Sequence, residues 1–548
     1  LRFRCPVQAV RVVRPVGEVA SMPAHPSRQT LFCNFVSVIE KPRKSAILTR
    51  CEAGSVSAVG MEAAANQSNQ PRESFARQVR NAVIWRSGSQ IVAQLVQWAA
   101  TFLVIRILSP HDYGLYAMTG VVLVFLNMLN GYGLASGLVQ RESVSRHEVR
   151  QLFGMLIALN ATLAIAQLLI APVAASYYRQ PEVAALLRVQ SLLYIATPFI
   201  ALPYAVLNRE MDFRRQAKVN IVASIVSAST ALGGALAGWG VWTLVFAPMA
   251  LFGTRAIGLT IAARVLVWPS FDFRGAGGLA RFGGMMAASQ LFWFLQCQAD
   301  VFIAGRHFTP HMLGIYTTSL FLTQIFVSKF VPPLNEVAFS AYARIQHDPA
   351  ATAAAFVKAV HVIMLVALPF YTGLAITAEP LVLTMLGDKW AEAIPVVRLL
   401  ACAMPFMTLQ VLFTPACDAR GRPGIGVRNG AVGAAILACA FLVAVRWGPV
   451  GLGWAWIAAY PLYLVASCWR ALPVIGVTAR GLADAIATPF AAALAMALAV
   501  TGIAALLPPL PALPQLAILV AAGALVYGGW LFVFARGTIA ELRGLIGR

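Results

Sequence analysis

Six charged side chains fall inside long apolar stretches of this sequence, where a charge costs the most free energy. They are the cations Arg86, Arg255, Arg281 and Lys329 and the carboxylates Asp300 and Glu336. Lys329 lies near the middle of an apolar segment, at least ten residues from either end, and Glu336 follows seven residues later on the same helical face. Charged residues placed in this way are functional candidates by default.

A set of buried cations has one evident chemical use, which is to hold a phosphate or diphosphate in a medium of low dielectric constant. Structural roles compete with this interpretation. Arg86 and Arg281 lie near segment ends, where a long side chain can extend to the membrane interface. Asp300 is close enough in sequence to Arg306 to pair with it. Lys329 has no such structural explanation, so we expect it to face a cavity.

The segments that position these residues are membrane spans. Of the 548 residues, 59% are apolar and 11% are charged, against about 25% charged in soluble domains. This composition excludes a soluble enzyme, a disordered scaffold and a single-span receptor. Fourteen segments are long enough to cross a bilayer, which requires about 20 apolar residues each. They lie at 84–107, 113–140, 151–178, 183–208, 217–238, 240–268, 279–305, 313–341, 356–383, 390–416, 427–446, 450–473, 482–507 and 515–536.

The loops between these spans predict the topology. Loops on one side, together with the C-terminal tail, carry 20 Lys and Arg residues, and the loops on the other side carry five. Because basic residues concentrate in cytoplasmic loops, both termini are predicted to be cytoplasmic. The net charge of +21 is then mostly a topology signal, and nucleic acid is not expected as a partner.

An internal repeat divides the spans into two sets of six. The run Ser109-Pro-His-Asp-Tyr-Gly-Leu-Tyr116 recurs 200 residues later as Thr309-Pro-His-Met-Leu-Gly-Ile-Tyr316. Two weaker matches follow in the same order at offsets of 200 to 210 residues. Because each copy holds an even number of spans, the copies are parallel repeats. We predict an N-lobe at 80–270, a C-lobe at 275–475, and two further spans with a cytoplasmic tail at 480–548.

The repeated run also predicts a local structure. Ser109 and Thr309 can cap the helices that follow them, and Asp112 is placed to complete a capping box. Tyr113, Tyr116 and Tyr316 are then expected at headgroup depth, where amphipathic rings are favoured. A tight helical hairpin is the preferred interpretation of this motif over a substrate site.

The N-terminal 75 residues differ in kind, with scattered proline and serine and an excess of basic residues. We predict that this stretch is disordered. One hypothesis is that the native start is Met61 and that the residues upstream of it are a translated leader; the alternative is an organelle transit peptide.

The sequence lacks the motifs that are typical of several classes of chemistry. No cysteine pair has zinc-ligand spacing, and no disulfide framework is implied. The chain has no G-x-x-x-x-G-K-[ST] motif for ATP and no His, Ser and Asp constellation, and the predicted external loops are short. We therefore expect neither an enzyme, nor a cofactor, nor a metal site.

Several motifs in the sequence resemble those of a known family. The run Trp85-Arg-Ser-Gly-Ser-Gln90 and the run Ile107-Leu-Ser-Pro-His-Asp-Tyr-Gly-Leu-Tyr116 resemble the opening of Wzx/WzxC-type polysaccharide flippases. Later runs agree: Leu207-Asn-Arg-Glu-Met-Asp-Phe-Arg-Arg215, Arg281-Phe-Gly-Gly284, Ala299-Asp-Val-Phe-Ile-Ala-Gly305 and Leu386-Gly-Asp-Lys-Trp390. These flippases belong to the multidrug/oligosaccharidyl-lipid/polysaccharide exporter superfamily, and the resemblance covers roughly residues 80–475. It implies an all-α polytopic fold similar to MATE transporters and MurJ.

The resemblance also implies a function. A protein of this type moves polyprenyl-pyrophosphate-linked oligosaccharide across the bacterial inner membrane for lipopolysaccharide, capsule or exopolysaccharide synthesis. It alternates between two access states, uses an ion gradient, and acts before a polysaccharide polymerase and chain-length machinery. The cationic cavity of such proteins would correspond by position to Lys329, Arg255, Arg86 and Arg281. Asp300 and Glu336 would be its proton- or ion-coupling carboxylates.

Three alternatives remain open from the residues. A drug/cation antiporter of the same superfamily is expected to use a carboxylate in its first lobe, and the first six spans hold no central Asp or Glu. A lipid II flippase shares the fold and the cationic cavity. A non-transporting scaffold of a glycan-assembly complex would leave the charged residues in the spans without a purpose.

Overall fold

The computed structural model describes residues 75–130, 145–264, 267–272 and 294–534; the side chains of residues 75–84, 86 and 87 are not described. Except for Phe75, the residues of the predicted disordered stretch 1–75, Met61 among them, lie outside the described residues. The same is true of Arg281 and of the side chain of Arg86. All contacts described lie within the unit Glu73–Arg548.

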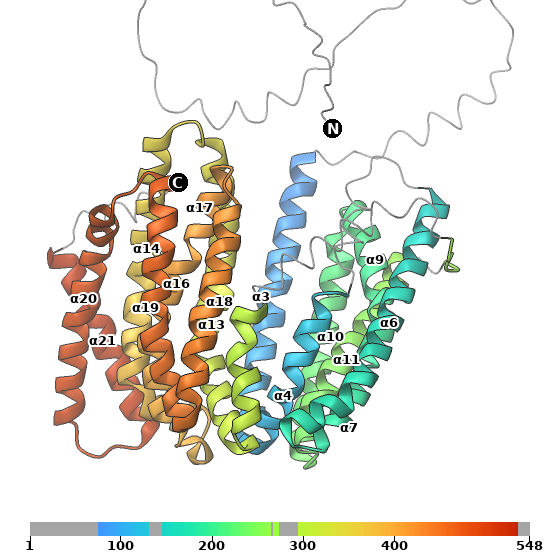
Figure 1. Ribbon diagram of the computed structural model, residues 1–548, viewed down its shortest axis with the longest axis horizontal. Helices are drawn as coiled ribbons and strands as arrows, with labels where there is room; N and C mark the ends of the chain where they lie inside the picture. The colour runs from blue at the N-terminus through green and yellow to red at the C-terminus, as the bar shows by residue number, and fades with distance from the viewer. Residues whose placement is uncertain (1–74, 131–144, 265–266, 273–293, 535–548) are drawn as a thin grey trace, which may run out of the picture. The chain divides into compact units, whose positions relative to one another are not determined.

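In the described part of the chain every regular element is a helix (Figure 1). The helices in the predicted N-lobe range are α3 (Phe75–Ile107), α4 (Pro110–Asn127), α6 (Arg146–Tyr178), α7 (Glu182–Gln190), α8 (Leu193–Ala196), α9 (Pro198–Arg209), α10 (Phe213–Leu236) and α11 (Val241–Ala263).

The C-lobe range begins in the described residues with a helical stretch at 294–307. The helices that follow are α13 (Pro310–Arg344), α14 (Pro349–Ile376), α15 (Ala378–Met385), η1 (Asp388–Trp390), α16 (Ala393–Val411), α17 (Phe413–Ala419), α18 (Gly424–Ala444), η2 (Val445–Trp447) and α19 (Gly448–Ile475). The last two helices are α20 (Ala479–Leu506) and α21 (Ala512–Phe534).

Each of the fourteen predicted spans falls wholly or partly on a described helix. Ten helical stretches among the described residues are long and apolar enough to cross a membrane, and one of them, Gly424–Ile475, contains two predicted spans. The predicted spans outside this set are 113–140, 279–305 and 313–341. The first two extend into residues that are not described, and the third is α13, which carries Lys329 and Glu336. The all-α, multi-span fold is confirmed, and the count of fourteen stays a prediction.

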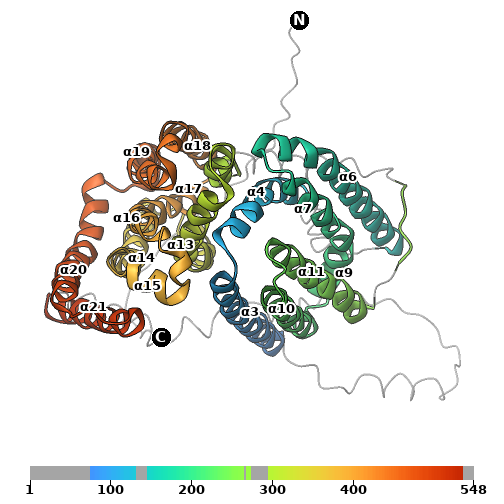
Figure 2. The same ribbon diagram turned by 90° about the horizontal axis from the view of Figure 1, so that it is seen from below.

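Apart from α4, whose main partner is α13 of the other predicted lobe, the helices pack mainly on helices of the same predicted lobe. In the N-lobe α10 contacts α3 and α11, and in the C-lobe α16 contacts α13, α14 and α19. Figure 2 shows these two groups of helices seen along their axes. The strongest contact between the groups joins α4 to α13, and these two helices begin with the two copies of the repeated motif.

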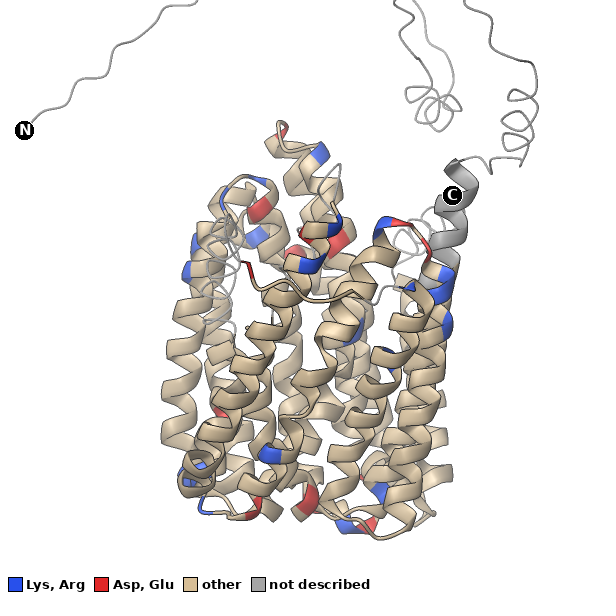
Figure 3. Cartoon of the chain, turned by 90° about the vertical axis from the view of Figure 1, so that its right-hand side faces the viewer, with Lys and Arg blue, Asp and Glu red and all other residues tan. Residues whose placement is uncertain are grey.

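Charged residues follow the pattern of a membrane protein. Figure 3 shows most Lys, Arg, Asp and Glu positions near the two ends of the helices, with few in between. This distribution leaves the middle of the helices apolar, as burial in hydrocarbon requires.

The tight join between the fifth and sixth predicted spans proves to be a turn between two separate helices. α10 ends at Leu236 and α11 begins at Val241. Gly238 and Gly240 have φ values of 75° and 55°, a region that side-chain-bearing residues rarely adopt. The chain therefore reverses direction within a few residues.

Candidate functional site

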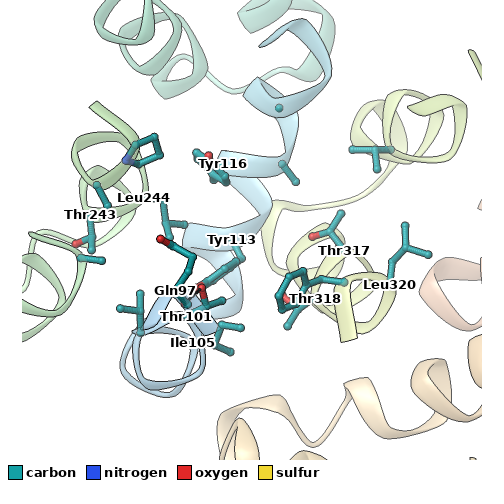
Figure 4. Close-up of a pocket in the computed structure, with 18 of the residues that line it drawn as sticks. Gln97, Thr101, Ile105, Tyr113, Tyr116, Thr243, Leu244, Thr317, Thr318 and Leu320 are labelled. Carbon is teal, nitrogen blue, oxygen red and sulfur yellow. Dashed lines mark hydrogen bonds between the residues drawn. The ribbon is translucent and has the colours of Figure 1, made fainter. Parts of the chain in front are cut away.

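A cavity of about 480 Å³ lies where the two lobes meet, and we call it the interlobe cavity (Figure 4). Its N-lobe wall comes from α3, α4, α10 and α11, and its C-lobe wall comes from the stretch 294–307 and α13. The volume falls within the range of about 300–1,000 Å³ that is typical of ligand sites.

The described residues that line the interlobe cavity are uncharged. Most are apolar, and the polar ones are Gln97, Thr101, Tyr113, Tyr116, Thr243, Gln298, Thr317, Thr318 and Gln324. The buried hydroxyl oxygens of Thr243 and Thr318 have no hydrogen-bond partner among the described residues. Because buried polar atoms are nearly always paired, these hydroxyls have unused capacity to bind a ligand or water. The cavity can therefore hold an uncharged, hydrogen-bonding group.

The structure places the predicted charged residues of α13 apart from this lining. Lys329 and Glu336 are both exposed, on the part of α13 beyond the segment Thr317–Gln324 that lines the cavity. Pro332 and Pro333 lie between them, where two backbone N–H donors are missing from the helix. Lys329 and Glu336 therefore lie on the same exposed part of α13, outside the cavity lining.

The other three predicted cations, Arg255, Arg86 and Arg281, are not among the described residues that line the cavity. Arg255 is half-buried in α11 and takes part in an interaction of its own, away from the cavity lining. The side chain of Arg86 and the whole of Arg281 lie outside the described residues. The prediction of one cationic cavity that joins these residues stays a prediction.

Asp300 lies in a buried hydrogen-bond chain inside the C-lobe. Its side chain is 1% exposed and accepts a hydrogen bond from the Tyr316 hydroxyl at 2.7 Å. The Trp456 indole Nε1–H donates to the same Tyr316 oxygen at 2.8 Å. The alternative that Asp300 pairs with Arg306 is wrong, because Arg306 donates to the backbone carbonyl of Tyr177 and lies over its ring.

The two copies of the repeated motif meet at one end of the lobes. Ser109 forms the predicted capping box with Asp112, and Thr309 caps α13. The helix starts are so close that a Cβ atom on Gly114 would lie 1.7 Å from the Pro310 carbonyl oxygen. A Cβ atom on Gly314 would lie 1.7 Å from the Pro110 carbonyl oxygen. Glycine is therefore required at both positions of this reciprocal contact.

The motif's tyrosines point into the protein, and their expected location at headgroup depth stays a prediction. Tyr316 is fully buried in the C-lobe. Tyr113 and Tyr116 line the interlobe cavity, and Tyr113 also packs edge-on against Trp390 with ring centroids 5.6 Å apart. The motif is both a helical hairpin and part of the cavity wall, because α4 turns its tyrosine-bearing face toward the C-lobe.

A second reciprocal contact involves two arginines that are 200 residues apart. Arg106 donates from Nη1 to the Thr384 carbonyl oxygen at 2.9 Å, so that the end of α3 is held to the C-lobe. Arg306 donates to the Tyr177 carbonyl oxygen, so that the equivalent helix end is held to the N-lobe. Each lobe thus provides one arginine and one acceptor at the same end of the molecule.

We expect replacement of both arginines, Arg106→Gln with Arg306→Gln, to lower the free energy of unfolding by about 2 kcal/mol, with about half of that for each single change. Each arginine makes a charge-assisted hydrogen bond between the lobes, and partial exposure reduces its contribution. Thermal unfolding of the purified chain measures this effect. Arg188→Gln, at an exposed arginine of α7, is the control. A double variant that unfolds like the control would contradict the prediction.

Sequence reasoning missed the neutral polar residues of the cavity. Glutamine and threonine occur throughout membrane helices, so their presence alone indicates no site. A signal was nonetheless present in the repeat, since Asp300 of one copy aligns with Ala100 of the other, and Ala100 lines the cavity.

The chain is similar in sequence to proteins of polysaccharide biosynthesis. Residues 103–395, more than half of the chain, match a protein family described as polysaccharide biosynthesis protein. The chain is 28% identical over 310 residues to the succinoglycan biosynthesis transport protein ExoT of Rhizobium meliloti, a match that covers 57% of this chain and 63% of ExoT. It is 23% identical to the teichuronic acid biosynthesis protein TuaB of Bacillus subtilis, over 83% of this chain and 95% of TuaB.

A third relative bears on the resemblance seen in the sequence. The lipopolysaccharide biosynthesis protein WzxC of Escherichia coli is 24% identical over 54% of this chain and 60% of WzxC. The matched segments thus span less than two thirds of ExoT and of WzxC. Among solved structures, the lipid II flippase MurJ in an inward closed conformation superposes with a TM-score of 0.67 at 11% identity, over 83% of this chain and 100% of MurJ. The predicted similarity of fold to MurJ is confirmed.

Proposed function

The chain belongs to the polysaccharide biosynthesis protein family, and from that premise we propose that it is a flippase for polyprenyl-diphosphate-linked oligosaccharide units. It moves these units from the cytoplasmic to the outer leaflet of a bacterial inner membrane. One observation carries this proposal, which is that the interlobe cavity draws its walls from both lobes. A site built by two lobes can open to either side of the membrane when the lobes change their contact.

The distribution of contacts supports an alternating-access mechanism. The lobes meet tightly at the N-terminal ends of α4 and α13, where the reciprocal glycine and arginine contacts lie. The other end of α13 presents large exposed side chains such as Phe330, Leu334 and Val337. The excess of basic residues in the loops at that second end supports a cytoplasmic location for it. The described conformation is then sealed on the outer side.

The charged residues divide the remaining work in this proposal. Lys329, Arg255, Arg86 and Arg281 bind the diphosphate, because cations with several donors match its oxygens. Asp300 and Glu336 take up and release the coupling proton. The exposure of Lys329 supports its part, since a lysine in the middle of a span needs water or an anion around it.

We expect Lys329→Ala to slow transport about tenfold or more, because loss of a charge-assisted hydrogen bond costs about 1.5–3 kcal/mol. The measurement is lipid-linked oligosaccharide accumulation on the inner leaflet of cells that lack this protein and are complemented with each variant at equal expression. Lys329→Arg should retain transport. Lys358→Ala, at an exposed lysine of α14, is the matched control.

The outcomes separate the candidate functions. Restored surface polysaccharide with wild type, and glycan trapped inside with Lys329→Ala, support the proposal. Intact surface glycans combined with sensitivity to cationic drugs would instead indicate the antiporter. Accumulated peptidoglycan precursor would indicate the lipid II flippase.

In the proposed pathway the product passes to a polysaccharide polymerase and its chain-length machinery.

A further inference from the structure

The N-lobe wall of the interlobe cavity includes the positions that correspond to Asp300, Tyr316 and Trp456, which fill the equivalent place in the C-lobe. We propose that this cavity is the recess for the uncharged sugar part of the substrate, and that the Tyr116 hydroxyl selects it by hydrogen bonding. The proposal rests on the flippase function and assigns the diphosphate to other residues.

The internal repeat shows which residue of the N-lobe corresponds to which residue of the C-lobe. From position 97 to position 120 the N-lobe aligns with 297–320 of the C-lobe at a constant offset of 200 residues. Arg106 then matches Arg306, and Gly114 matches Gly314; both pairs make equivalent contacts in the structure. The alignment is therefore structural as well as sequential.

In the C-lobe this position is closed by direct packing. Tyr316 donates its hydroxyl hydrogen to Asp300 and accepts the indole N–H of Trp456. The Trp456 ring stacks on Tyr460 at 4.8 Å between centroids. The side chains of Asp300, Tyr316 and Trp456 are all hydrogen-bonded, so this cluster has no capacity left to bind a ligand.

In the N-lobe the same position is open. Ala100 stands where the C-lobe has Asp300, and Tyr116 stands where it has Tyr316. The match of Trp239-Gly240 with Trp447-Gly448 sets an offset of 208 residues, which places Pro248 where the C-lobe has Trp456. Ala100, Tyr116 and Pro248 all line the interlobe cavity. Because the N-lobe lacks the carboxylate and the indole, space remains beside Tyr116. The Tyr116 hydroxyl also lacks the two hydrogen-bond partners that the Tyr316 hydroxyl has in the C-lobe.

The chemistry of the walls indicates what the space accepts. Its described lining carries no charge, so a diphosphate placed there would lose its hydration without compensation. A polyprenyl tail would leave Gln97, Gln298 and Gln324 without partners. A sugar ring matches both parts of the lining, because its hydroxyl groups can pair with the amides and hydroxyls and its C–H faces can pack on tyrosine rings.

The C-lobe wall adds a second function to the recess. Gln298, Thr318 and Gln324 of the C-lobe line the cavity together with residues of the N-lobe. Figure 4 shows Thr317 and Thr318 across the space from Thr243 and Leu244. A sugar bound there contacts both lobes at once, so its binding energy changes when the lobes separate. The glycan thereby contributes to the choice between the two access states.

The test measures binding of two probes to the purified full chain in lipid nanodiscs. One probe is the oligosaccharide released from its lipid by mild acid, and the other is undecaprenyl diphosphate without sugar. We expect Tyr116→Phe to weaken oligosaccharide binding about fivefold to tenfold. Ala100→Asp, which restores the acid of the C-lobe, should abolish it. Both variants should bind undecaprenyl diphosphate within about twofold of wild type.

A neighbouring pair on α13 provides a matched control. Gln324 lines the cavity, whereas Thr323 is buried and bonds to its own helix. Gln324→Leu should weaken oligosaccharide binding, and Thr323→Val should leave it unchanged. If Ala100→Asp fails to fold, Tyr116→Phe and Gln324→Leu still decide the question.

Three results would overturn the inference: no binding of free oligosaccharide to wild type, unchanged oligosaccharide binding in the variants, or weakened binding of undecaprenyl diphosphate alone. Flipping of the intact lipid-linked substrate, measured in parallel in liposomes, tests the transport function separately from the sugar recess. Failure of wild type to flip rejects the proposed function. Flipping by wild type together with unaffected oligosaccharide binding in the variants rejects only the recess.

Discussion

Gly314→Ala is expected to abolish transport while the protein still folds. The new methyl group would lie 1.7 Å from the carbonyl oxygen of Pro110, which belongs to the helix start of the other lobe. Overpacking typically costs about 1–3 kcal/mol, and a backbone carbonyl cannot rotate away as a side chain can. The population sealed at this end should fall about one hundredfold. Gly114→Ala should have the same effect through Pro310.

The measurement is the distance between spin labels on either side of the contact, at Glu182 and Asp388, which are both exposed. The labels should move apart in the variant as the lobes separate at this end. Gly233→Ala is the control, because a Cβ atom at Gly233 meets open space and alanine favours a helix. Unchanged label distances and normal transport in Gly314→Ala would show that the close approach is not required.

Asp300→Ala is the second change with a large expected effect. It removes the acceptor of the buried Tyr316 O–H, so this hydroxyl still accepts the hydrogen bond from Trp456 but has lost the group to which it donates. We expect a loss of about 2 kcal/mol in the free energy of unfolding, because buried polar groups left unpaired cost about 1–3 kcal/mol each. Thermal unfolding in detergent measures this loss.

The conservative variant Asp300→Asn separates structure from coupling. The amide oxygen can still accept from Tyr316, so most of the stability should return. If Asp300 is the coupling carboxylate, transport by this variant should no longer respond to a proton gradient. Asp388→Asn, at an exposed carboxylate, should change neither property. A variant that is stable and still driven by protons would leave Asp300 with a structural role only.

The sequence predicts well those features that depend on local chemistry. Apolar length places the helices, and the capping box at Ser109 and Asp112 forms as expected. The repeated motif predicts two parallel copies, and the copies do meet through equivalent residues, Gly114 and Gly314. These features follow from short-range geometry and from hydrophobicity, which a single sequence contains.

The parts that could not be predicted depend on which way a side chain faces. Tyr116 and Tyr316 occupy the same place in the repeat, yet one lines a cavity and the other is paired with Asp300. The difference arises from residues at remote positions, including Trp456 and its counterpart Pro248. Arg306 likewise bonds to Tyr177 and not to Asp300, because the partner comes from the other lobe.

The reciprocal contact at the starts of α4 and α13 is an isologous interface within one polypeptide. In a symmetric dimer such a surface places every residue under two demands, since each change occurs twice and must match itself. Fusion of the two copies removes this restriction. A substitution at Gly114 no longer forces the same substitution at Gly314, and the interiors behind the contact can diverge while the contact remains. One half of this chain holds a packed acid and indole, and the other half has space at the corresponding positions, so that a protein with two similar halves holds one copy of a site that a symmetric dimer, off its axis, would hold twice.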